Sequence, residues 1–574
     1  MRSADDCPIA VFVDHCDGTL SHVFDEEMIR YIAGLPQVVS CYQDENLLHP
    51  GRLEKLMAKV RKGRADRVVI VGRSPKVYEE SFRRLGTRTE LDPYMFLVAN
   101  VREQGAWMVS DEAVAREKIR EVVARKVKEA KFLTPIGHEK VAVPKRAVIL
   151  GGGVVGMRTA LALANANIDV TLLTRAKDIG GKAVQLTHFY DRPGEVSAWF
   201  RDQIKEVKKH KNITVKGSVE LKGLDGCLGD YRIKIQDASG KKGIVKGSAV
   251  VLAMGNDVIP NTEGIFGHER FIAPPQIEAM LKDEGTSLKD KKRKPIRTVT
   301  FVLDLVNESI KIDSANAVKN AILLRRDYGT TVYVICRDVK VSLDGMEKQY
   351  RKAREMGVIF IKYDDPPRFS LVDSQVNIEV KEASTQLKGD EYSLSILSDL
   401  VVVSERFVPS PDNEMLADII GLPRPEEGFL MDDNPQFAWV RTNRRGIYIA
   451  GGCRYPQTLD EALIEATAAA AEVTELLSTG TYEYDLAVAE IDPEKCAVCL
   501  TCPRVCPHSA IVVEKYAEKN IYVTKGYEKD FQWKAARILP AQCYACGICV
   551  SSCPTKAITL KHLTDAEITQ QIGV

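Results

Sequence analysis

Eight cysteines near the C-terminus constrain this chain more than any other feature. They form two runs of identical spacing, each followed by proline: Cys496-x-x-Cys499-x-x-Cys502-x-x-x-Cys506 and Cys543-x-x-Cys546-x-x-Cys549-x-x-x-Cys553. In such pairs of runs, three thiolates of one run hold a 4Fe–4S cluster and the fourth cysteine reaches the other cluster. The predicted ligand sets are therefore Cys496, Cys499, Cys502 and Cys553 for one cluster, and Cys543, Cys546, Cys549 and Cys506 for the second.

Structural zinc is the alternative, because zinc sites also use Cys-x-x-Cys pairs. A zinc site needs four ligands and does not require three cysteines in succession at this interval. Both runs are complete, and each ends in Cys-Pro, so the pattern favours iron–sulfur clusters. Because clusters of this kind carry single electrons, the rest of the chain is expected to supply or receive electrons.

The composition indicates an ordinary globular protein of several domains. A length of 574 residues predicts about four domains, and a net charge of +1 gives no indication of a nucleic-acid partner. No apolar run reaches the roughly 18 residues of a membrane-spanning helix, and the N-terminus lacks the apolar stretch of a secretory signal. The cysteines outside the two runs form no Cys-x-x-Cys pair, which argues against a disulfide framework. We therefore expect a cytoplasmic protein with no direct membrane span.

Short apolar runs alternate with amphipathic stretches in the N-terminal quarter of the chain. The expected strands are Ile9–Val13, Val38–Tyr42, Arg67–Val71 and Met95–Ala99. The expected helices are Glu26–Leu35, Arg52–Arg61, Tyr78–Leu85 and Ser110–Lys131. This alternation favours a small α/β domain with a parallel sheet.

A glycine-rich turn after this domain predicts a dinucleotide site. The buried strand Arg146–Leu150 leads into Gly151-x-Gly153-x-x-Gly156, and a helix and a second strand, Asp169–Leu173, follow. The first glycine allows the tight turn, the second lets the backbone approach a pyrophosphate, and the third lets helix and strand pack closely. The phosphates are expected at the N-terminus of the helix.

The identity of the dinucleotide depends on the segments that follow. Thr174 and Arg175 stand where an acid usually binds the ribose hydroxyls, and Arg175 alone would suggest the 2′-phosphate of NADP. Three segments favour FAD instead: Ile179–Lys182, Val250–Gly255, and Thr442–Gly452, in which Gly452 replaces a common acid. The residues predicted to contact FAD are Gly151, Gly153, Val155, Gly156, Thr174, Arg175, Gly180, Gly181, Lys182, Ala253, Gly255, Gly451 and Gly452. Lys182 is also a candidate to stabilise reduced flavin.

A second nucleotide-type unit is expected after the charged stretch Lys282–Lys294. Its predicted elements are Thr298–Leu303, Ser314–Arg326, Thr331–Ile335, Met346–Met356 and Val358–Ile361. The turn after its first strand, Asp304–Ser309, contains no glycine, and the acids Asp304 and Glu308 would repel a pyrophosphate. We therefore predict that this unit has no NAD(P) site.

These segments together predict an α/β protein. The core is an FAD-binding Rossmann-type fold, similar to thioredoxin reductase, with an α/β domain before it and a bacterial-type ferredoxin domain with two clusters after it. The predicted boundaries are 1–143 for the N-terminal domain, 144–281 and 406–482 for the two parts of the FAD domain, 282–405 for the second nucleotide fold, and 483–574 for the ferredoxin domain. Residues 512–539 are expected to form a hairpin or a short helix.

The parts together resemble the A-type subunit of heterodisulfide reductase over nearly the whole chain. The resemblance rests on Asn100–Glu103, Ser74-Pro75 with Phe82–Arg84, Gly151–Gly156, Gly180–Leu186, Ala321–Leu324, Val408–Ser410 and the two cysteine runs. It implies an oxidoreductase: an FAD and iron–sulfur electron-transfer subunit of a cytoplasmic redox complex. It further implies partners similar to the B and C subunits or to analogous reductase subunits, ferredoxin as another partner, and a homodimeric core. In some members the flavin bifurcates electron pairs between a low-potential and a high-potential acceptor.

The chain departs from this pattern where family members carry an additional cluster. The matching stretches read Arg73–Pro75, Gln104–Ala106 and Asp313–Ala317 and contain no cysteine, so we expect the extra cluster to be absent, with Cys16 and Cys41 as remnants.

Two rival functions stay open. One is a self-contained NAD(P)H:ferredoxin-type oxidoreductase, and the other is a scaffold subunit with a degenerate redox role.

Overall fold

The chain forms two compact units. A computed structural model describes residues 7–49, 51, 52, 55, 58, 60, 65–78, 92–189, 196–261, 264–282, 288, 295–305, 308–383, 393–423, 425–516, 533–561 and 569. One unit comprises Met1–Lys140 with Glu483–Val574, and the other comprises Val141–Tyr482. Among the described residues, no helix has the length and apolar character needed to cross a membrane.

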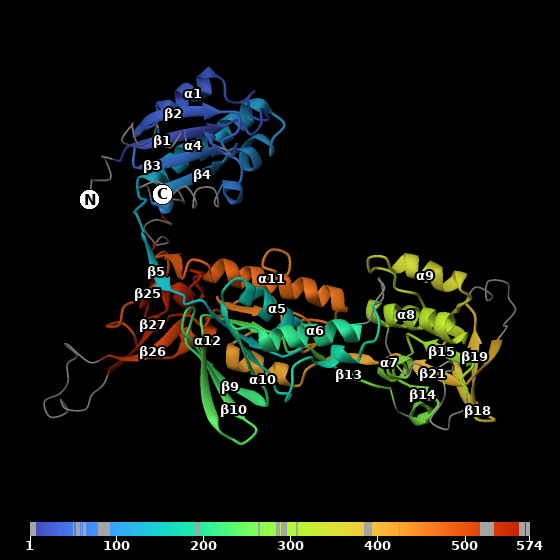
Figure 1. The fold of residues 1–574 in the computed structure, drawn as a ribbon. Helices are drawn as coiled ribbons and strands as arrows, with labels where there is room; N and C mark the ends of the chain where they lie inside the picture. Colours follow the sequence, from blue (N-terminus) through green and yellow to red (C-terminus); the bar gives the residue numbers. More distant parts are fainter. Residues whose placement is uncertain are drawn as a thin grey trace. The chain divides into compact units, whose positions relative to one another are not determined.

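The N-terminal part of the first unit is a four-stranded parallel sheet with the order β2-β1-β3-β4 (Figure 1). Its elements are β1 (Ile9–Asp14), α1 (Glu26–Ala33), β2 (Val38–Asp44), β3 (Arg67–Gly72), η1 (Pro93–Met95), β4 (Phe96–Asn100), the short π-helix η2 (Arg102–Ala106) and α4 (Glu112–Ala130). Alternate residues of β1 enter apolar clusters on opposite faces of the sheet, so the whole strand is buried and forms one apolar run. The predicted parallel α/β domain is confirmed. The predicted helices Arg52–Arg61 and Tyr78–Leu85 lie largely outside the described residues.

The C-terminal part of the first unit consists of short elements around the cysteine runs. They are β25 (Ala489–Ile491), α12 (Thr501–Val505), β26 (Ile511–Tyr516), β27 (Trp533–Ile538), η6 (Pro540–Gln542), α13 (Ile548–Ser551) and β28 (Ile558–Leu560). β25 pairs antiparallel with β28, and β26 pairs antiparallel with β27. The paired β26 and β27 are the arms of the hairpin that was one of the two expectations for residues 512–539, and residues 517–532 between them lie outside the described ranges.

The second unit contains a five-stranded sheet with the order β23-β12-β6-β7-β8. Its strands are β6 (Arg146–Leu150), β7 (Asp169–Leu173), β8 (Ile213–Lys216), β12 (Ala249–Leu252) and β23 (Ile447–Ile449). The helices are α5 (Val154–Asn165), α6 (Val196–Lys209), α10 (Asp412–Ile420) and α11 (Leu459–Leu477), and η3 (Lys182–Gln185) precedes α6. An antiparallel sheet of β9 (Val219–Asp225), β10 (Tyr231–Asp237) and β11 (Lys242–Gly247) and a ribbon of β13 (Asn256–Ile259) with β22 (Arg406–Pro409) complete this part. Helices α5 and α11 lie side by side (Figure 1), and Thr159 Oγ1 donates to the Ala466 carbonyl between them.

A second five-stranded parallel sheet in the same unit has the order β14-β21-β15-β16-β17. Its elements are η4 (Gly264–Gly267), β14 (Phe271–Ile272), α7 (Pro274–Lys282), β15 (Thr298–Val302), α8 (Lys311–Tyr328), β16 (Thr331–Cys336), α9 (Met346–Glu355), β17 (Ile359–Lys362) and β21 (Leu400–Val403), with an antiparallel sheet of β18 (Arg368–Val372), β19 (Gln375–Lys381) and β20 (Ser393–Ser398). β14 pairs with β21, and α7 contributes Ile277 and Leu281 to the core of this sheet. Both elements precede residue 282, the predicted boundary between the two folds. Strand pairing and core packing assign them to the second sheet, whereas the boundary was predicted from the charged stretch that begins at Lys282. Strands β5 (His138–Ala142) and β24 (Thr481–Asp485) pair with each other.

Candidate functional site: a glycine-lined crevice and two groups of thiols

The turn between β6 and α5 leaves no room for a side chain at two of its glycines. Gly151 has a φ of +120°, and a Cβ there would lie 2.2 Å from the Ala253 carbonyl oxygen. A Cβ on Gly156 would lie 1.8 Å from the Gly151 carbonyl oxygen. Apart from Gly153 and its neighbours in the chain, no atom of the described residues lies within 4 Å of a Cβ built on Gly153, so the backbone at the N-terminus of α5 borders open space. This is the arrangement that lets a pyrophosphate approach backbone N–H groups.

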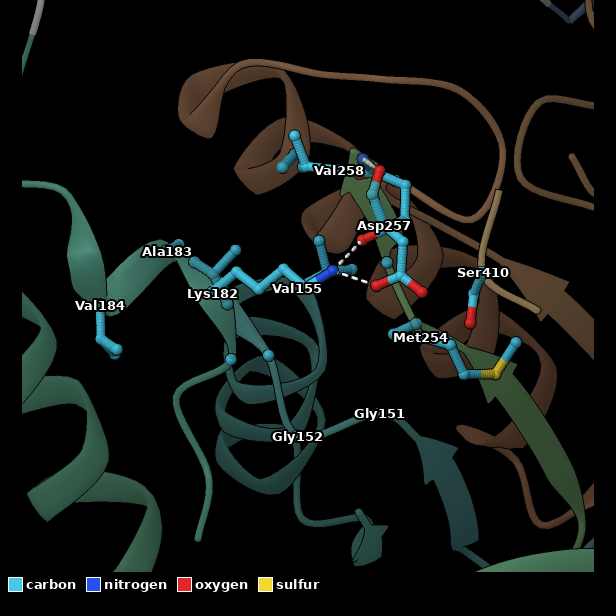
Figure 2. Close-up of a pocket in the computed structure, with 18 of the residues that line it drawn as sticks. Gly151, Gly152, Val155, Lys182, Ala183, Val184, Met254, Asp257, Val258 and Ser410 are labelled. Atoms are coloured by element: carbon cyan, nitrogen blue, oxygen red, sulfur yellow. Dashed lines mark hydrogen bonds and ion pairs between the residues drawn. The ribbon is translucent and has the colours of Figure 1, made fainter. Parts of the chain in front are cut away.

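The open space belongs to a crevice of about 1060 Å³ (Figure 2). This volume is at the upper end of the usual range for ligand pockets, about 300–1,000 Å³. The residues predicted to contact FAD that line it are Gly151, Gly153, Val155, Thr174, Arg175, Gly181, Lys182, Ala253, Gly255 and Gly452. The other three lie next to lining residues: Gly156 against Gly151, Gly180 against Val184, and Gly451 against Val155. The structure thus brings the predicted residues together around one cavity.

Acidic side chains from other elements line the end of the crevice where the acid after β7 is missing. Thr174 is buried, and the exposed Arg175 places its Nη1 2.5 Å from Asp412 Oδ2 at the start of α10. Asp412 and Glu220 both line the crevice. Because Asp412 neutralises Arg175, this end of the crevice is less attractive to a 2′-phosphate than the sequence alone suggests.

Asn256 occupies the space of the acid that Gly452 replaces. A Cβ on Gly452 would lie 2.3 Å from Asn256 Oδ1. The neighbouring Gly451 N–H donates to Glu465 Oε2 at 2.7 Å, and the buried Arg454 bridges Glu465 and Asp432. A buried ionic network therefore fixes the returning segment at the crevice, and an amide takes the place of the carboxylate.

Lys182 is engaged by the protein itself. Figure 2 shows its side chain directed at Asp257, and its Nζ donates to the Asp257 carboxylate and, at 2.8 Å, to the Asn256 carbonyl. The positive charge is largely compensated by Asp257, which weakens the prediction that Lys182 stabilises reduced flavin.

A third ion pair of the lining, between Lys319 and Glu278, is almost fully buried. Lys319 on α8 and Glu278 on α7 form an ion pair with side chains 5% and 3% exposed, and the Thr187 N–H donates to Glu278 Oε2 at 3.0 Å. Burial raises the pKa of Glu278, but the Lys319 charge and the hydrogen bonds outweigh it and hold this pKa below its ordinary value. These contacts connect α7 and α8 to the segment after η3, and local sequence patterns gave no signal for them.

The residues present fit a bound dinucleotide. Both amide atoms of Gln457, next to the start of α11, are buried without a hydrogen-bond partner among the described residues, and Gln457 lines the crevice. Buried polar atoms are normally satisfied, so this amide is available to a ligand. The open backbone at Gly153 and the glycine contacts at Gly151 and Gly156 provide the place for its phosphates.

The equivalent turn in the second nucleotide fold is closed by a carboxylate. Asp304 is buried with a φ of +60°. Its oxygens accept hydrogen bonds from the Ser309 N–H at 2.6 Å and the Arg337 N–H at 2.9 Å, while Ser309 Oγ accepts from the Asp304 N–H. A negative side chain therefore takes the backbone donors that a phosphate would need. The absence of an NAD(P) site in this unit remains a prediction that these contacts support.

The eight thiols of the cysteine runs gather into two groups of four. One small cavity is lined by Cys496, Cys499, Cys502 and Cys553, and another by Cys506, Cys543, Cys546 and Cys549. These are the sets that the spacing predicts. Burial and then the neighbouring thiols of its own group raise the pKa of Cys502 and of Cys549 to about 11. A bound cluster would lower the pKa of these thiols instead, because metal ligation requires thiolates.

Backbone donors already point at several of these sulfurs. The Ala510 N–H donates to Cys506 Sγ at 3.4 Å, the Ala545 N–H to Cys543 Sγ at 3.4 Å, and the Ala557 N–H to Cys553 Sγ at 3.3 Å. Hydrogen bonds to ligating sulfurs tune the potential of a cluster. The ring of Tyr544 stacks on His508 at 4.3 Å between centroids beside the second group.

The N-terminal sheet carries a closed polar network at its strand ends. Asp14 is fully buried, accepts from the Cys16 N–H at 2.9 Å, and hydrogen-bonds the Tyr78 hydroxyl. Arg73, from one of the matching stretches that contain no cysteine, places its Nη2 2.6 Å from Asp17 Oδ2. Burial raises the pKa of Cys16 and of Cys41 to about 11. Among the described residues, no three His, Cys, Asp or Glu side chains are close enough to share one metal ion.

Comparisons with known proteins agree with this division of the chain. Residues 495–558 match the family model of the 4Fe-4S dicluster domain. The chain is 26% identical to the A-type subunit of the H(2):CoB-CoM heterodisulfide,ferredoxin reductase of Methanothermobacter thermautotrophicus, covering 89% of this chain and 92% of the relative. It is 24% identical to the A-type iron-sulfur subunit of the CoB--CoM heterodisulfide reductase of Methanocaldococcus jannaschii, covering 89% and 91%. The chain resembles the A-type subunit of heterodisulfide reductase.

This resemblance to heterodisulfide reductase was the one predicted from the sequence, and it is confirmed over about nine tenths of the chain. The predicted enzyme class, an oxidoreductase, agrees with these relatives. Among solved structures, thioredoxin reductase of Lactococcus lactis is similar to 58% of this chain and 99% of its own, at 18% identity and a TM-score of 0.41. The dicluster match and the fit of the crevice agree with the predicted cofactors, FAD and two 4Fe–4S clusters.

Proposed function

We propose that this chain is the flavin and iron–sulfur electron-transfer subunit of a redox complex like heterodisulfide reductase. FAD in the glycine-lined crevice exchanges electron pairs, and the two groups of four thiols hold 4Fe–4S clusters that carry single electrons. The observation that carries the proposal is that one chain combines both sites while the described lining of the crevice contains no cysteine. The described lining therefore offers no disulfide that could accept the electron pair, so the clusters are the acceptors that the chain itself offers.

The proposed roles of the residues follow from their positions. Gly151, Gly153 and the N-terminus of α5 hold the pyrophosphate. Asn256 and Gln457 supply amide groups in place of the missing acid. When bound, FAD supplies the conversion between two-electron and one-electron chemistry. The protein positions that group and limits the access of water to it.

The partners of the proposed electron-transfer protein are other subunits of the complex. They resemble the B and C subunits or analogous reductase subunits, with ferredoxin as a further acceptor and a homodimeric core. Relatives whose names include both heterodisulfide and ferredoxin support this assignment. Electron bifurcation by the flavin is part of the proposal and requires that one of two acceptors has a low potential.

Anaerobic purification followed by a redox titration tests the function. About eight irons and one FAD per chain, with flavin and clusters that equilibrate with each other, are the expected results. A flavin that never exchanges electrons with the clusters refutes the proposal, and eight irons without flavin favour a scaffold or a cluster relay. Bleaching of the flavin in the isolated chain by NADH or NADPH would favour the self-contained oxidoreductase, against which the Asp304 contacts argue.

A further inference from the structure

Glu405 differs from the other acids around the crevice. It lies between β21 and β22, lines the crevice and is half-buried. In the part of the chain that the structure describes, its carboxyl has no hydrogen-bond or ion-pair partner. Four other carboxyls of the lining have a basic partner: Asp257 with Lys182, Glu278 with Lys319, Asp412 with Arg175, and Glu220 with Lys222.

Two charged side chains act on the Glu405 carboxyl: Asp313 from α8 and Lys182 from η3. Asp313 accepts from the Ile310 N–H at 2.9 Å, and the charge of the buried Asp304 acts on it in turn. Lys182 already pairs with Asp257 of β13, which compensates its charge, and Arg406, the next residue of β22, is exposed. Such an arrangement favours a bound proton on the Glu405 carboxyl.

The proton affinities of the two unpaired carboxyls agree with this geometry. Burial and then the charge of Asp313 raise the pKa of Glu405 to about 7, against the opposing effect of Lys182. Burial raises the pKa of Asp313 to about 7 as well, and Asp304 adds to the increase. Because the charge of Asp313 acts on Glu405, the protonation of the two carboxyls is coupled near neutral pH.

The proposed electron transfer needs a place for one proton. A flavin that gains an electron pair takes up a proton, whereas a cluster accepts its single electron without one. When two electrons leave the crevice, one to each cluster, two clusters are reduced and one proton is left over. A carboxylate with a pKa near the working pH is the most efficient acceptor for such a proton.

We propose that Glu405, in exchange with Asp313, is the group that holds this proton in the crevice. The inference rests on the proposed function for the source of the proton. The protonation of Glu405 near neutral pH is inferred from its half-buried position in the crevice without a hydrogen-bond or ion-pair partner among the described residues, and it can be tested independently of that function.

Glu405→Gln in the anaerobically purified full chain tests the proposal by two measurements. The first is the infrared difference spectrum between about pH 6 and pH 8, which needs no electron donor. The wild type should show the carbonyl bands of two protonated carboxyls that disappear at the higher pH, those of Glu405 and Asp313. Glu405→Gln should lack the Glu405 band and keep that of Asp313, and Glu405→Asp should keep both. The second is the midpoint potential of the flavin against pH, which should change slope near pH 7 in the wild type and not in Glu405→Gln.

Glu427→Gln is the matched control, because Glu427 is exposed and does not line the crevice. Both readouts should remain those of the wild type in this variant. An infrared spectrum of Glu405→Gln with the same carboxyl bands as the wild type, or a wild type without such bands, overturns the proposal. So does an unchanged break in the potential of Glu405→Gln. If the wild type shows the Glu405 band but its flavin and clusters do not exchange electrons, the proposed function fails and the assignment of the protonated carboxyl stands.

Discussion

Replacement of Lys319 by methionine should destabilise the second unit by leaving a charge buried without a partner. The side chains of Lys319 and Glu278 are 5% and 3% exposed, and loss of one member of such a buried pair costs about 3–5 kcal/mol. In a unit that spans Val141–Tyr482, each kcal/mol lowers the melting temperature by about 2 °C. Lys319→Met should therefore melt about 6–10 °C below the wild type at pH 7, as followed by circular dichroism and by hydrogen exchange of α8.

The pH dependence of this variant separates a lost charge from lost packing. In the wild type the pKa of Glu278 is lowered, so its contribution to stability is present above about pH 4.3 and is lost as the pH falls through the lowered pKa. Without Lys319, only the hydrogen bonds from Thr187 oppose the effect of burial, and the pKa of Glu278 should rise. The contribution of Glu278 to the stability of the variant is then fully present below about pH 4.3 and is lost as the pH rises. The difference in melting temperature between variant and wild type should therefore become smaller at acidic pH.

Two further variants complete the test of the buried pair. Lys319→Met combined with Glu278→Leu removes both charges and should recover most of the lost stability at pH 7. Lys340→Met breaks the more exposed pair with Glu308 on the same fold and should cost less than about 1 kcal/mol. A melting temperature of Lys319→Met within about 2 °C of the wild type, or a deficit that acid does not reduce, would refute the reasoning.

Three other predictions concern the crevice and the clusters. Cys553→Ser should lower the iron content from about eight to about four per chain and remove the same electron paramagnetic resonance signal as Cys496→Ser; loss of the signal assigned to Cys549 instead would show that the runs do not cross. Gly153→Val places a side chain in the open crevice and should weaken FAD binding by about ten-fold or more while the flavin-free chain melts as the wild type does, whereas Gly156→Val, with its Cβ position 1.8 Å from the Gly151 oxygen, should not fold. Asp313→Asn should stabilise the second unit above pH 7 and leave it unchanged near pH 4, because the raised pKa of Asp313, about 7, removes stability as the pH rises; equal melting temperatures of variant and wild type at pH 8 would contradict this.

The sequence by itself determined the local features of this protein. The cluster cysteines, the Gly151–Gly156 turn and the buried strands of the N-terminal sheet are set by spacing and periodicity along a few consecutive residues. The two cavities of four thiols have the membership that the cysteine spacing implies. The missing acid at Thr174 and the glycine-free turn at Asp304 were also visible, because a residue type that a motif requires is absent there.

What only the tertiary structure decided is how distant residues compensate for these departures. Asp412 meets Arg175 from a helix 237 positions away in the chain, Asn256 fills the space beside Gly452, and the buried Lys319–Glu278 pair joins two helices. No local pattern encodes such contacts, since a lysine or glutamate in a helix usually faces solvent. Long-range packing determines which of them become buried and paired, and it leaves Glu405 at the crevice without a basic partner among the described residues.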